Sequence, residues 1–453
     1  MTISATSPAP PARAAGVTEA LARGATAFAL AGLDPAVLHE AKRSLFNVLA
    51  VAIGAARHPG VDAILRVARE ACGPGNAPVV GRTVRVDAHA AALANGFAGH
   101  VDDYDDTHLA TVIHPAASIA ATLLALAPET SPAGAAAMRA FVLGCEVQLR
   151  VGVAISPEHY DDGWHITGTC GTIGAAVAAA ALFGLDAEAT ARAIGIAAST
   201  TVGQREAFGT MAKAYHAGKA AANGIRAARL ARGGFTAPAD ALAAGFAGAL
   251  AHAHRIESLA VAFDGRWELA NNTYKPYPCG IVAHPAIDAA VALAPRVRRD
   301  AIASVVVHCN PLVPELMGNL APKDGLQARF SAVHGVTMGL YAGTVGLAQY
   351  EDATVLDPAV GALRARVQLA PSAAMPRDAA RVVVTHDDGT TVEEAVTHAR
   401  GSLERPLTDR ELGAKATALV EPILPGRTDT LRQAVSDLAG APSLDALIAA
   451  VTA

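Results

Sequence analysis

Apolar residues recur at helical spacing through most of the first 265 positions, and short Gly, Pro or Asp breaks separate the segments. Residues at i, i+3, i+4 and i+7 share one face of an α-helix, so this periodicity predicts a succession of helices. The last of them ends at Gly233-Gly234, a typical C-terminal stop. The clearest predicted helical segments are 35–56, 89–99, 135–155, 172–183, 187–199 and 213–232.

The pattern changes near residue 266, where runs typical of β-strands begin. The clearest are 303–310 and 380–399. The second run consists of two alternating halves that flank Asp387-Asp388-Gly389, which predicts a β-hairpin. A helical segment, 332–347, lies between the two runs. This part of the chain is therefore predicted to be α+β.

Helical patterns return after residue 405, where Thr408 and Glu411 have the spacing of a helix cap. The order helical, α+β, helical predicts a mainly α fold. In it, a large helical domain formed by 17–265 and 405–453 carries an inserted, smaller α+β lid domain, 266–404. Residues 1–16, rich in Pro, Ser and Ala, are predicted to be disordered. Ligand sites favour interfaces between domains.

Composition and charge narrow the function classes. The chain is 52% hydrophobic but only 4% aromatic, so Ala, Val and Leu must fill the core. A formal net charge of −5 and the lack of a basic run argue against nucleic-acid or anionic-membrane binding. No secretory signal pattern begins the chain, and the longest apolar stretch, 171–185, is shorter than the roughly 20 residues of a membrane span. We expect a soluble, cytoplasmic protein.

The cysteines are scattered and no C-x-x-C pair occurs, which argues against a disulfide framework, an iron–sulfur cluster and a structural zinc site. Cys279 follows a proline, but nothing in the sequence lowers its pKa, so we interpret it as a buried structural thiol. We expect neither a metal nor a cofactor. The cysteines are Cys72, Cys145, Cys170, Cys279 and Cys309.

Ionisable residues are concentrated in AGHVDDYDDTHLATVIHP, residues 98–115, which holds four aspartates and three histidines. Three interpretations compete: a metal site, a proton-transfer site and a solvated loop. DDYDD matches the Asp-rich pattern by which all-helical prenyl-transfer enzymes hold magnesium, but no second acidic motif of similar density exists. Short acidic loops are common on protein surfaces, so the solvated loop stays open at this point.

Further polar clusters interrupt the apolar chain. In DDGWHITGTCGTIGAA (161–176), His165 precedes a predicted helix start, whose free N–H groups suit an anion. In GTMAKAYHAGKAAANG (209–224), Lys213 and His216 share a helical face. NNTYKPYPCGIVAHPAIDAA (271–290) adds Lys275, Tyr277 and His284, whereas Lys323 and Arg329 are assigned to a solvated helix. Each residue alone has a structural explanation. Together they are the groups that an enzyme of small polycarboxylates needs.

Taken in order, four polar segments resemble the MmgE/PrpD family, and the resemblance extends over roughly residues 17–450. The segments are HVDDYDDTHLATVIHPAAS, GWHITGTCGTIGAA, GTMAKAYHAGKAAANG and YKPYPCGIVAHPAIDAA. This family includes 2-methylcitrate dehydratase, cis-aconitate decarboxylase and iminodisuccinate epimerase. The resemblance implies a helical domain with an inserted lid, a homodimer, no cofactor and a small di- or tricarboxylate substrate. It implies catalytic roles for Asp103, Thr107, His114, His165, Lys213 and His284, and substrate binding by His216, Lys275 and Tyr277.

The expected reaction is removal of a proton α to a carboxylate, giving a short-lived aci-carboxylate. Loss of water, as in a dehydratase, is the favoured outcome, and epimerisation or decarboxylation are the alternatives. A magnesium-dependent prenyl-transfer-type enzyme and a non-catalytic binding protein are more remote alternatives. The family resemblance supports the class of reaction better than the particular substrate.

We assign stabilisation of the developing negative charge to Lys213 and His165, and binding of a distal carboxylate to Lys275. Asp103 and His114 are the candidate acid/base pair.

Two further roles depend on local structure. Thr107 would orient Asp103 from one helical turn away if that stretch is helical. His284 would join the site when the lid closes.

Overall fold

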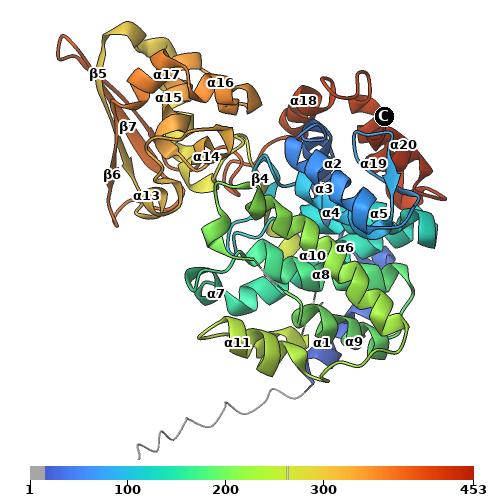
Figure 1. Ribbon diagram of the computed structural model, residues 1–453. Coiled ribbons are helices and arrows are strands. Elements are labelled where there is room, and N and C mark those ends of the chain that lie inside the picture. Colours follow the sequence, from blue (N-terminus) through green and yellow to red (C-terminus); the bar gives the residue numbers. More distant parts are fainter. Residues whose placement is uncertain (1–15, 202, 262, 264) are drawn as a thin grey trace, which may run out of the picture.

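The computed structural model describes residues 16–201, 203–261, 263 and 265–453 (Figure 1). Helices predominate in this part of the chain, which confirms the mainly α fold. The disorder predicted for 1–16 falls outside the described residues except at Gly16. Within the described part no single helix is long and apolar enough to cross a membrane. The helices α2 and α3 together would be long and apolar enough, with a bend of 84° between them.

Every predicted helical segment before residue 265 overlaps an observed helix. The largest difference is at α8, which begins at Ile166 instead of 172. The start of α8 is rich in Thr and Gly, which are weak helix formers, but it is fully buried, and tertiary packing stabilises it. The elements of this part are α1 (Val17–Ala27), α2 (Pro35–Gly54), α3 (Pro59–Ala71), β1 (Ala77–Pro78), β2 (Arg85–Val86), α4 (Ala88–Ala98), β3 (Asp106–His108), α5 (Pro115–Thr130), α6 (Gly134–Ile155), α7 (Glu158–Asp161), α8 (Ile166–Leu182), α9 (Ala187–Ala198), α10 (Met211–Arg232) and α11 (Gly248–Leu250).

The helices α4, α5, α8 and α10 pack closely on one another because small residues face each other. At Gly96, an added Cβ would lie 2.7 Å from the Cα of Gly218, so α4 and α10 meet backbone to backbone there. At Gly224, an added Cβ would lie 2.5 Å from the Cβ of Ala175 on α8. The alanine-rich composition thus produces close helix contacts, and these fix the ends of the four helices relative to one another.

The C-terminal helices pack against the first helices of the chain, and Figure 1 shows α18 beside α2. The predicted cap of α18 is confirmed: Thr408 and Glu411 form a reciprocal capping box. This part consists of α18 (Asp409–Val420), α19 (Thr428–Asp437) and α20 (Asp445–Val451).

The α+β part contains a four-stranded sheet with strand order β6-β5-β7-β8. Strands β5 and β6 are parallel, whereas β7 is antiparallel to both β5 and β8. The predicted hairpin is confirmed, with Gly389 at φ 79° in its turn. The helix α15 ends at Ala342, before the predicted 347, because Gly343 takes the left-handed conformation that terminates a helix. The elements are β4 (Asn272–Tyr274), α12 (His284–Leu293), β5 (Ile302–Cys309), α13 (Leu312–Met317), α14 (Gly325–Ala328), α15 (Ala332–Ala342), α16 (Asp352–Val355), α17 (Pro358–Arg364), β6 (Val367–Pro371), β7 (Ala380–His386) and β8 (Thr391–Val396).

Two hydrophobic cores are present in the described residues. The first draws its buried side chains from 17–274 and 407–451, and the second from 277–384. The short strand β4 lies between these groups in sequence and pairs with β3, so that Asp106 is opposite Tyr274. This pairing holds the aspartate-rich segment beside the start of the second core. The domain boundaries at 266 and 404 and the lid function stay predictions.

Candidate active site

A cavity of about 60 Å³ lies where residues of the two cores meet. Its polar lining comes from four segments that are far apart in sequence, and its apolar lining comes mostly from the second core region. The polar residues are Asp103, Thr107, His114, Tyr160, His165, Lys213 and Lys275, and the remaining residues are Val112, Phe208, Gly280, Ile281, Val282, Leu316, Met317 and Phe330.

Asp103 lies between two lysines. Its Oδ1 accepts a hydrogen bond from Lys213 Nζ, and its Oδ2 lies 2.8 Å from Lys275 Nζ. Asp103 has φ 49°, in the left-handed region, so the chain turns sharply here and is not helical. All three side chains are buried, with exposed fractions of 2 to 6%. The arrangement is a buried carboxylate shared by two cations.

The charges of this group depend on one another. Burial raises the pKa of Asp103, but the ammonium groups of Lys213 and Lys275 lower it more, so it lies well below its usual value. Burial lowers the pKa of Lys213, and Asp103 opposes this effect. Asp103 is thus ionised. An anion that enters the cavity would compete with it for the same ammonium protons.

His114 precedes the first residue of α5 and is held through its Nδ1. This nitrogen lies 2.9 Å from the carbonyl oxygen of Asp106, 3.0 Å from Asp105 Oδ1 and 3.3 Å from Thr107 Oγ1. Two of these partners can only accept, so Nδ1 carries the proton and the unprotonated Nε2 can act as a base. Burial lowers the pKa of His114, although Asp105 opposes it, so the ring is neutral.

Asp105 contacts a second histidine. Its Oδ2 lies 2.6 Å from Nδ1 of His100, a fully buried ring that packs edge-on against His114. Burial raises the pKa of Asp105, but His100 and His114 lower it more, and the carboxylate is ionised. Burial lowers the pKa of His100 to about 3. One carboxylate therefore fixes the orientation of two neutral imidazoles.

His165 precedes α8 and contacts the first turns of α10. Its Nδ1 lies 2.9 Å from Nδ1 of His216, so one ring donates a hydrogen bond to the other. Burial, together with the Lys213 ammonium, holds the pKa of His165 well below its usual value. The ring packs edge-on against Phe208 at 5.2 Å between centroids. A neutral imidazole thus faces the cavity beside Lys213.

Three helices begin at the cavity: α5 follows His114, α8 follows His165, and Lys213 is in the first turn of α10. The N-terminal end of a helix carries a partial positive charge and favours a bound anion. These helix ends add to the two lysines, so the cavity is built to receive negative charge.

Not all predicted site residues line the cavity. His216 lies behind His165. Tyr277 donates to Asp288 from within the second core, and His284 Nε2 lies 3.3 Å from the carbonyl oxygen of Cys279 and faces a neighbouring groove. The prediction that Thr107 orients Asp103 across a helical turn is wrong, because Asp103 lies in a turn and Thr107 in strand β3, where it contacts His114.

The structure also corrects two surface assignments. The solvated-loop interpretation of 98–115 is wrong, because all four of its aspartates are buried. Arg329 is also buried: its Nη2 lies 2.8 Å from Asp102 Oδ1, and its Nη1 donates to the Asp102 carbonyl oxygen. By contrast, Cys279 is a buried thiol as expected, and burial raises its pKa to about 12.

The sequence-based prediction missed His100, Asp105 and Lys415. Lys415 on α18 is buried next to the site. It donates hydrogen bonds to Asn47 Oδ1 and to the carbonyl oxygens of Tyr104 and Lys275, at 2.6 to 3.0 Å. The only signal for the first two was their position in the aspartate-rich segment. Nothing in the sequence around Lys415 distinguished it from a surface lysine.

Side-chain atoms of His100, Asp103, Asp105 and His114 lie within 4.8 Å of one another, close enough to hold a metal ion. However, both oxygens of Asp103 already accept from ammonium groups, and Asp105 already pairs with two imidazoles. A cation here would meet two ammonium charges. The donor set fits a substrate anion at Lys213 and Lys275 better than it fits a metal.

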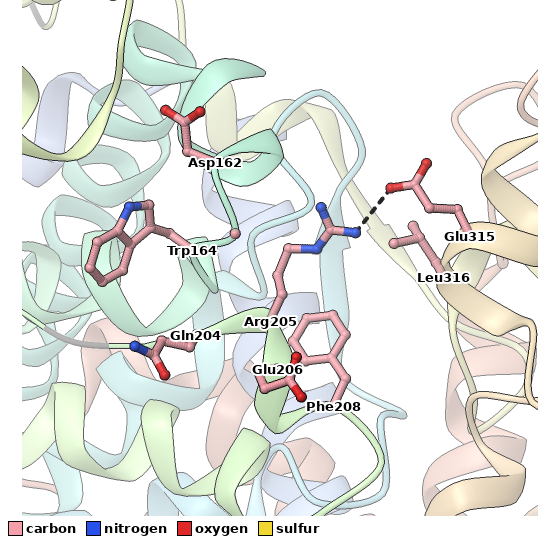
Figure 2. A pocket seen from close by; sticks show the side chains of 9 residues that line it. Asp162, Trp164, Gln204, Arg205, Glu206, Phe208, Glu315 and Leu316 are labelled. Carbon is pink, nitrogen blue, oxygen red and sulfur yellow. Dashed lines mark hydrogen bonds and ion pairs between the residues drawn. The ribbon is translucent and has the colours of Figure 1, made fainter.

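A second pocket of about 460 Å³ adjoins the cavity, because Phe208 and Leu316 line both (Figure 2). Figure 2 shows Arg205, on the 3₁₀ helix η2 (Arg205–Ala207), pointing across this pocket to Glu315 on α13. Their ion pair, at 3.1 Å, joins the helical part to the α+β part.

Sequence comparison decides the family. The MmgE/PrpD N-terminal domain matches residues 19–258, and the MmgE/PrpD C-terminal domain matches residues 277–439. The chain belongs to the MmgE/PrpD family. This confirms the resemblance seen in the four polar segments. Three of these segments lie within the N-terminal domain match and supply most of the polar residues of the cavity. Lys275, from the fourth, lies two residues before the C-terminal domain match.

Relatives within the family have names that specify an activity. The chain is 26% identical to the cis-aconitate decarboxylase-like protein oryM of Aspergillus oryzae, over 96% of this chain and 97% of that protein. It is 28% identical to the cis-aconitate decarboxylase of Aspergillus terreus, over 60% and 59%. It is 27% identical to the human cis-aconitate decarboxylase, over 74% and 73%.

Proposed function

We propose that this MmgE/PrpD protein is a cofactor-independent lyase of small di- or tricarboxylates, and that it releases carbon dioxide through a carbanion next to a remaining carboxylate. The observation that carries the proposal is the buried Asp103, held between Lys213 and Lys275 and flanked by the neutral rings of His114 and His165. The decarboxylase relatives support the same class of reaction.

The lysines supply the stabilisation that this chemistry needs. When carbon dioxide leaves, the electrons of the broken carbon–carbon bond stay on the substrate and spread into a conjugated carboxylate, which becomes a dianion. Lys213 and Lys275 would pair with that charge, and the helix ends of α5, α8 and α10 would add to it. One such contact typically contributes about 3 kcal/mol to the transition state, or around a hundredfold in rate.

The carbanion must then take up a proton. Of the two ammonium groups in the cavity, we assign the acid role to Lys213, because burial lowers its pKa and so eases proton transfer. His114 and His165 are neutral, so in this scheme they accept hydrogen bonds or protons and do not donate as imidazolium ions. The proton that Lys213 gives up returns from solvent before the next turnover.

The apolar wall favours carbon dioxide as the leaving group. Ile281, Val282 and Met317 line the cavity together with the polar residues. A carboxylate that lies against these three apolar side chains loses hydration without gaining a hydrogen bond from them, whereas neutral carbon dioxide has no such cost.

Loss of water, the outcome favoured from the sequence, is the second candidate. It is supported by the placement of a neutral histidine base and an ammonium acid in one cavity, His114 and Lys213. In this route His114 Nε2 would take the α proton and Lys213 would protonate the leaving hydroxyl group.

A panel of cis-aconitate, citrate-type hydroxy-tricarboxylates and related diacids, followed by NMR in D₂O, tests the proposal. Carbon dioxide release with deuterium incorporated next to a carboxylate supports decarboxylation, and an unsaturated product without loss of carbon supports dehydration. A folded protein that neither converts nor exchanges any member of the panel contradicts both routes.

Removal of metals should leave activity unchanged. Asp103 and Asp105 are already occupied by ammonium and imidazole groups, so catalysis by the residues described here needs no metal ion. Turnover is measured after exhaustive dialysis against EDTA. Loss of activity with recovery on addition of magnesium would support the Asp-rich metal interpretation instead.

The homodimer and the cytoplasmic location stay predictions. The first was implied by the family resemblance, and the second was inferred from the cysteine usage and the lack of a signal pattern. The proposed catalytic scheme uses residues of one chain only.

A further inference from the structure

A groove of about 250 Å³ runs beside the catalytic cavity and is several times larger than it. It lies between the segments 109–112 and 156–161 of the helical part and residues of the α+β part. The groove and the cavity are contiguous, because they share five lining residues: Val112, Tyr160, Ile281, Val282 and Leu316.

The wall that the groove shares with the cavity is apolar except for Tyr160. Leu109, Pro157, Pro285 and Leu312 continue the apolar surface away from the cavity. The two cationic residues of the groove are more exposed: Arg377 is exposed, and the Arg400 side chain is 43% exposed. A ligand that extends from the cavity into the groove therefore meets hydrocarbon first.

Val112 stands at the junction in a strained conformation. Its φ of 54° places a β-branched residue in the left-handed region, which L side chains rarely adopt. The turn is held closed because the backbone N–H of His108 donates to the Ile113 carbonyl oxygen at 2.8 Å, and His108 Nδ1 contacts Thr111 Oγ1 at 2.9 Å. Such strain persists where the surroundings over-determine it, and here it fixes a side chain between two cavities.

We infer that the groove is a second substrate subsite that binds an unbranched alkyl arm, so that the protein prefers an alkyl-substituted polycarboxylate. This inference rests on the proposed function, since the carboxylate-bearing end of the ligand would lie at Lys213 and Lys275. The alkyl arm passes Val112 and Leu316 and lies along Leu312. Val112 thereby sets the width of the passage.

The test is a series of ligands with one head group: succinate, methylsuccinate, propylsuccinate and hexylsuccinate. Their dissociation constants are measured by calorimetry, which does not depend on turnover. We expect affinity to rise about fourfold per added methylene until the groove is full. An arm of the same length that ends in a carboxylate should bind less tightly than the alkyl arm.

Two variants distinguish binding of the alkyl arm in the groove from non-specific hydrophobic binding elsewhere on the protein. Leu312→Asp places a charge in the groove at the first residue of α13, where an acidic side chain suits the helix, and should abolish the gain per methylene. The matched control is Leu356→Asp, at a leucine that is 60% exposed and lines neither cavity, which should keep the gain.

A second variant, Val112→Gly, fits the left-handed backbone without strain, so it guards against a folding defect. It should widen the passage and admit a branched arm, such as that of 2-(2-ethylbutyl)succinate, which the unmodified protein excludes.

The outcomes distinguish this inference from the proposed function. If succinate binds but affinity does not rise with arm length, or if Leu312→Asp keeps the rise, the groove is not an alkyl subsite and the proposed function stands. Tighter binding of the carboxylate-ended arm would also overturn the alkyl assignment. If no succinate binds and no panel substrate is converted, both proposals fall.

Discussion

Asp103, Lys213 and Lys275 form a buried group in which the negative charge of one residue serves two positive charges. With a substrate absent, this pairing keeps both ammonium groups in a region that excludes most water. With a polycarboxylate present, the cations have more anionic partners than before, and their protons can be shared with the substrate. At the scale of the residue, the site is thus arranged to exchange one carboxylate partner for another.

Lys213→Gln should lower turnover by at least about a hundredfold, because it removes one cation from the developing dianion. The variant also leaves Asp103 with Lys275 alone, and breaking a buried pair typically destabilises a protein by about 3 to 5 kcal/mol. Urea unfolding gives the folded fraction of the variant, and turnover is therefore expressed per folded molecule.

Lys219→Gln is the matched control for this variant, since Lys219 lies on the same helix but does not line the cavity. Equal loss of turnover in the two variants would remove Lys213 from the mechanism.

Asp105→Asn should lower kcat by about a hundredfold with little effect on KM, because an amide cannot accept from His100 and His114 at the same time. Asp105 acts through His114 and is a positioning residue. The His114 ring would lose its fixed tautomer, which imidazole proton NMR and the pH profile of kcat can detect. An unchanged pH profile with a lower Tm would indicate a purely structural role.

The residues could be predicted from the sequence only in part. Asp103, His114, His165, Lys213 and Lys275 were predicted and do line one cavity, because helix starts and polar clusters mark functional positions. The pairing of Asp103 with Lys213 was not predictable, since 110 positions separate them. Tyr277 and His284 belong to a correctly chosen segment, but their side chains face Asp288 and Cys279.

At the scale of the element, the site depends on where helices begin and on one lysine that ties elements together. Lys415 connects α18 to α2 through Asn47, to the aspartate-rich segment through Tyr104, and to the residue after β4 through Lys275. Burial lowers the pKa of Lys415 to about 7. The C-terminal part of the chain therefore supports the backbone on both sides of Asp103.

Lys415→Met should destabilise the protein by about 3 kcal/mol, because buried acceptors on Asn47, Tyr104 and Lys275 lose their donor. Turnover should also fall, since Lys275 loses its backbone support. Urea unfolding and NMR turnover measure the two effects.

Lys42→Met is the comparison for Lys415→Met: it removes an exposed hydrogen bond to the Ser436 carbonyl oxygen and should cost less than about 1 kcal/mol. If Lys415→Met costs no more than Lys42→Met, α18 does not support the site.

Elements were more predictable than their ends. Periodicity located the helices and the hairpin because both patterns are local. It missed the start of α8, where the polar and glycine-rich residues 166–171 are buried by neighbouring helices. The role considered for Thr107 required a helix near Asp103, where the chain instead makes a left-handed turn that no local pattern indicates.

At the scale of the whole molecule, stability should fall in acid because buried histidines are neutral when folded. Burial lowers the pKa of His100 and of His284 to about 3 and that of His334 to about 4. Unfolded histidines titrate near 6.5, so their contribution to stability is complete above pH 6.5 and is lost as pH falls toward 4 and 3. Each such histidine changes the free energy of unfolding by about 1.4 kcal/mol per pH unit in that window.

Buried carboxyl groups with a raised pKa oppose this trend. Burial raises the pKa of Asp106 to about 7, so the folded protein holds a proton there that the unfolded chain releases above about pH 4. Glu40 and Glu146 also have a raised pKa, but in the described residues nine histidines have a lowered pKa and outnumber these three carboxyl groups. We therefore expect the free energy of unfolding, measured with urea, to be lower at pH 5 than at pH 7 by at least about 3 kcal/mol. Equal or greater stability at pH 5 would show that these histidines are protonated in the folded state.

The overall architecture followed from the order of local patterns, because helical and β periodicities occupy separate stretches of the chain. The meeting of four distant segments at one cavity did not follow from those patterns, and only the family resemblance suggested it. Long-range packing of small residues on α4, α5, α8 and α10 brings the segments together, and that packing leaves no periodic signal of its own.

The cavity draws its ionisable groups mainly from the helical part and its hydrocarbon wall mainly from the α+β part. In the proposed scheme, most of the catalytic groups therefore belong to the helical part, and most of the apolar contacts to the substrate belong to the α+β part. We expect substitutions at Ile281, Val282 or Met317 to change which substrate is accepted while the residues that transfer protons are retained. In a protein divided in this way, substitutions in the α+β part can change the substrate while the catalytic residues of the helical part are retained.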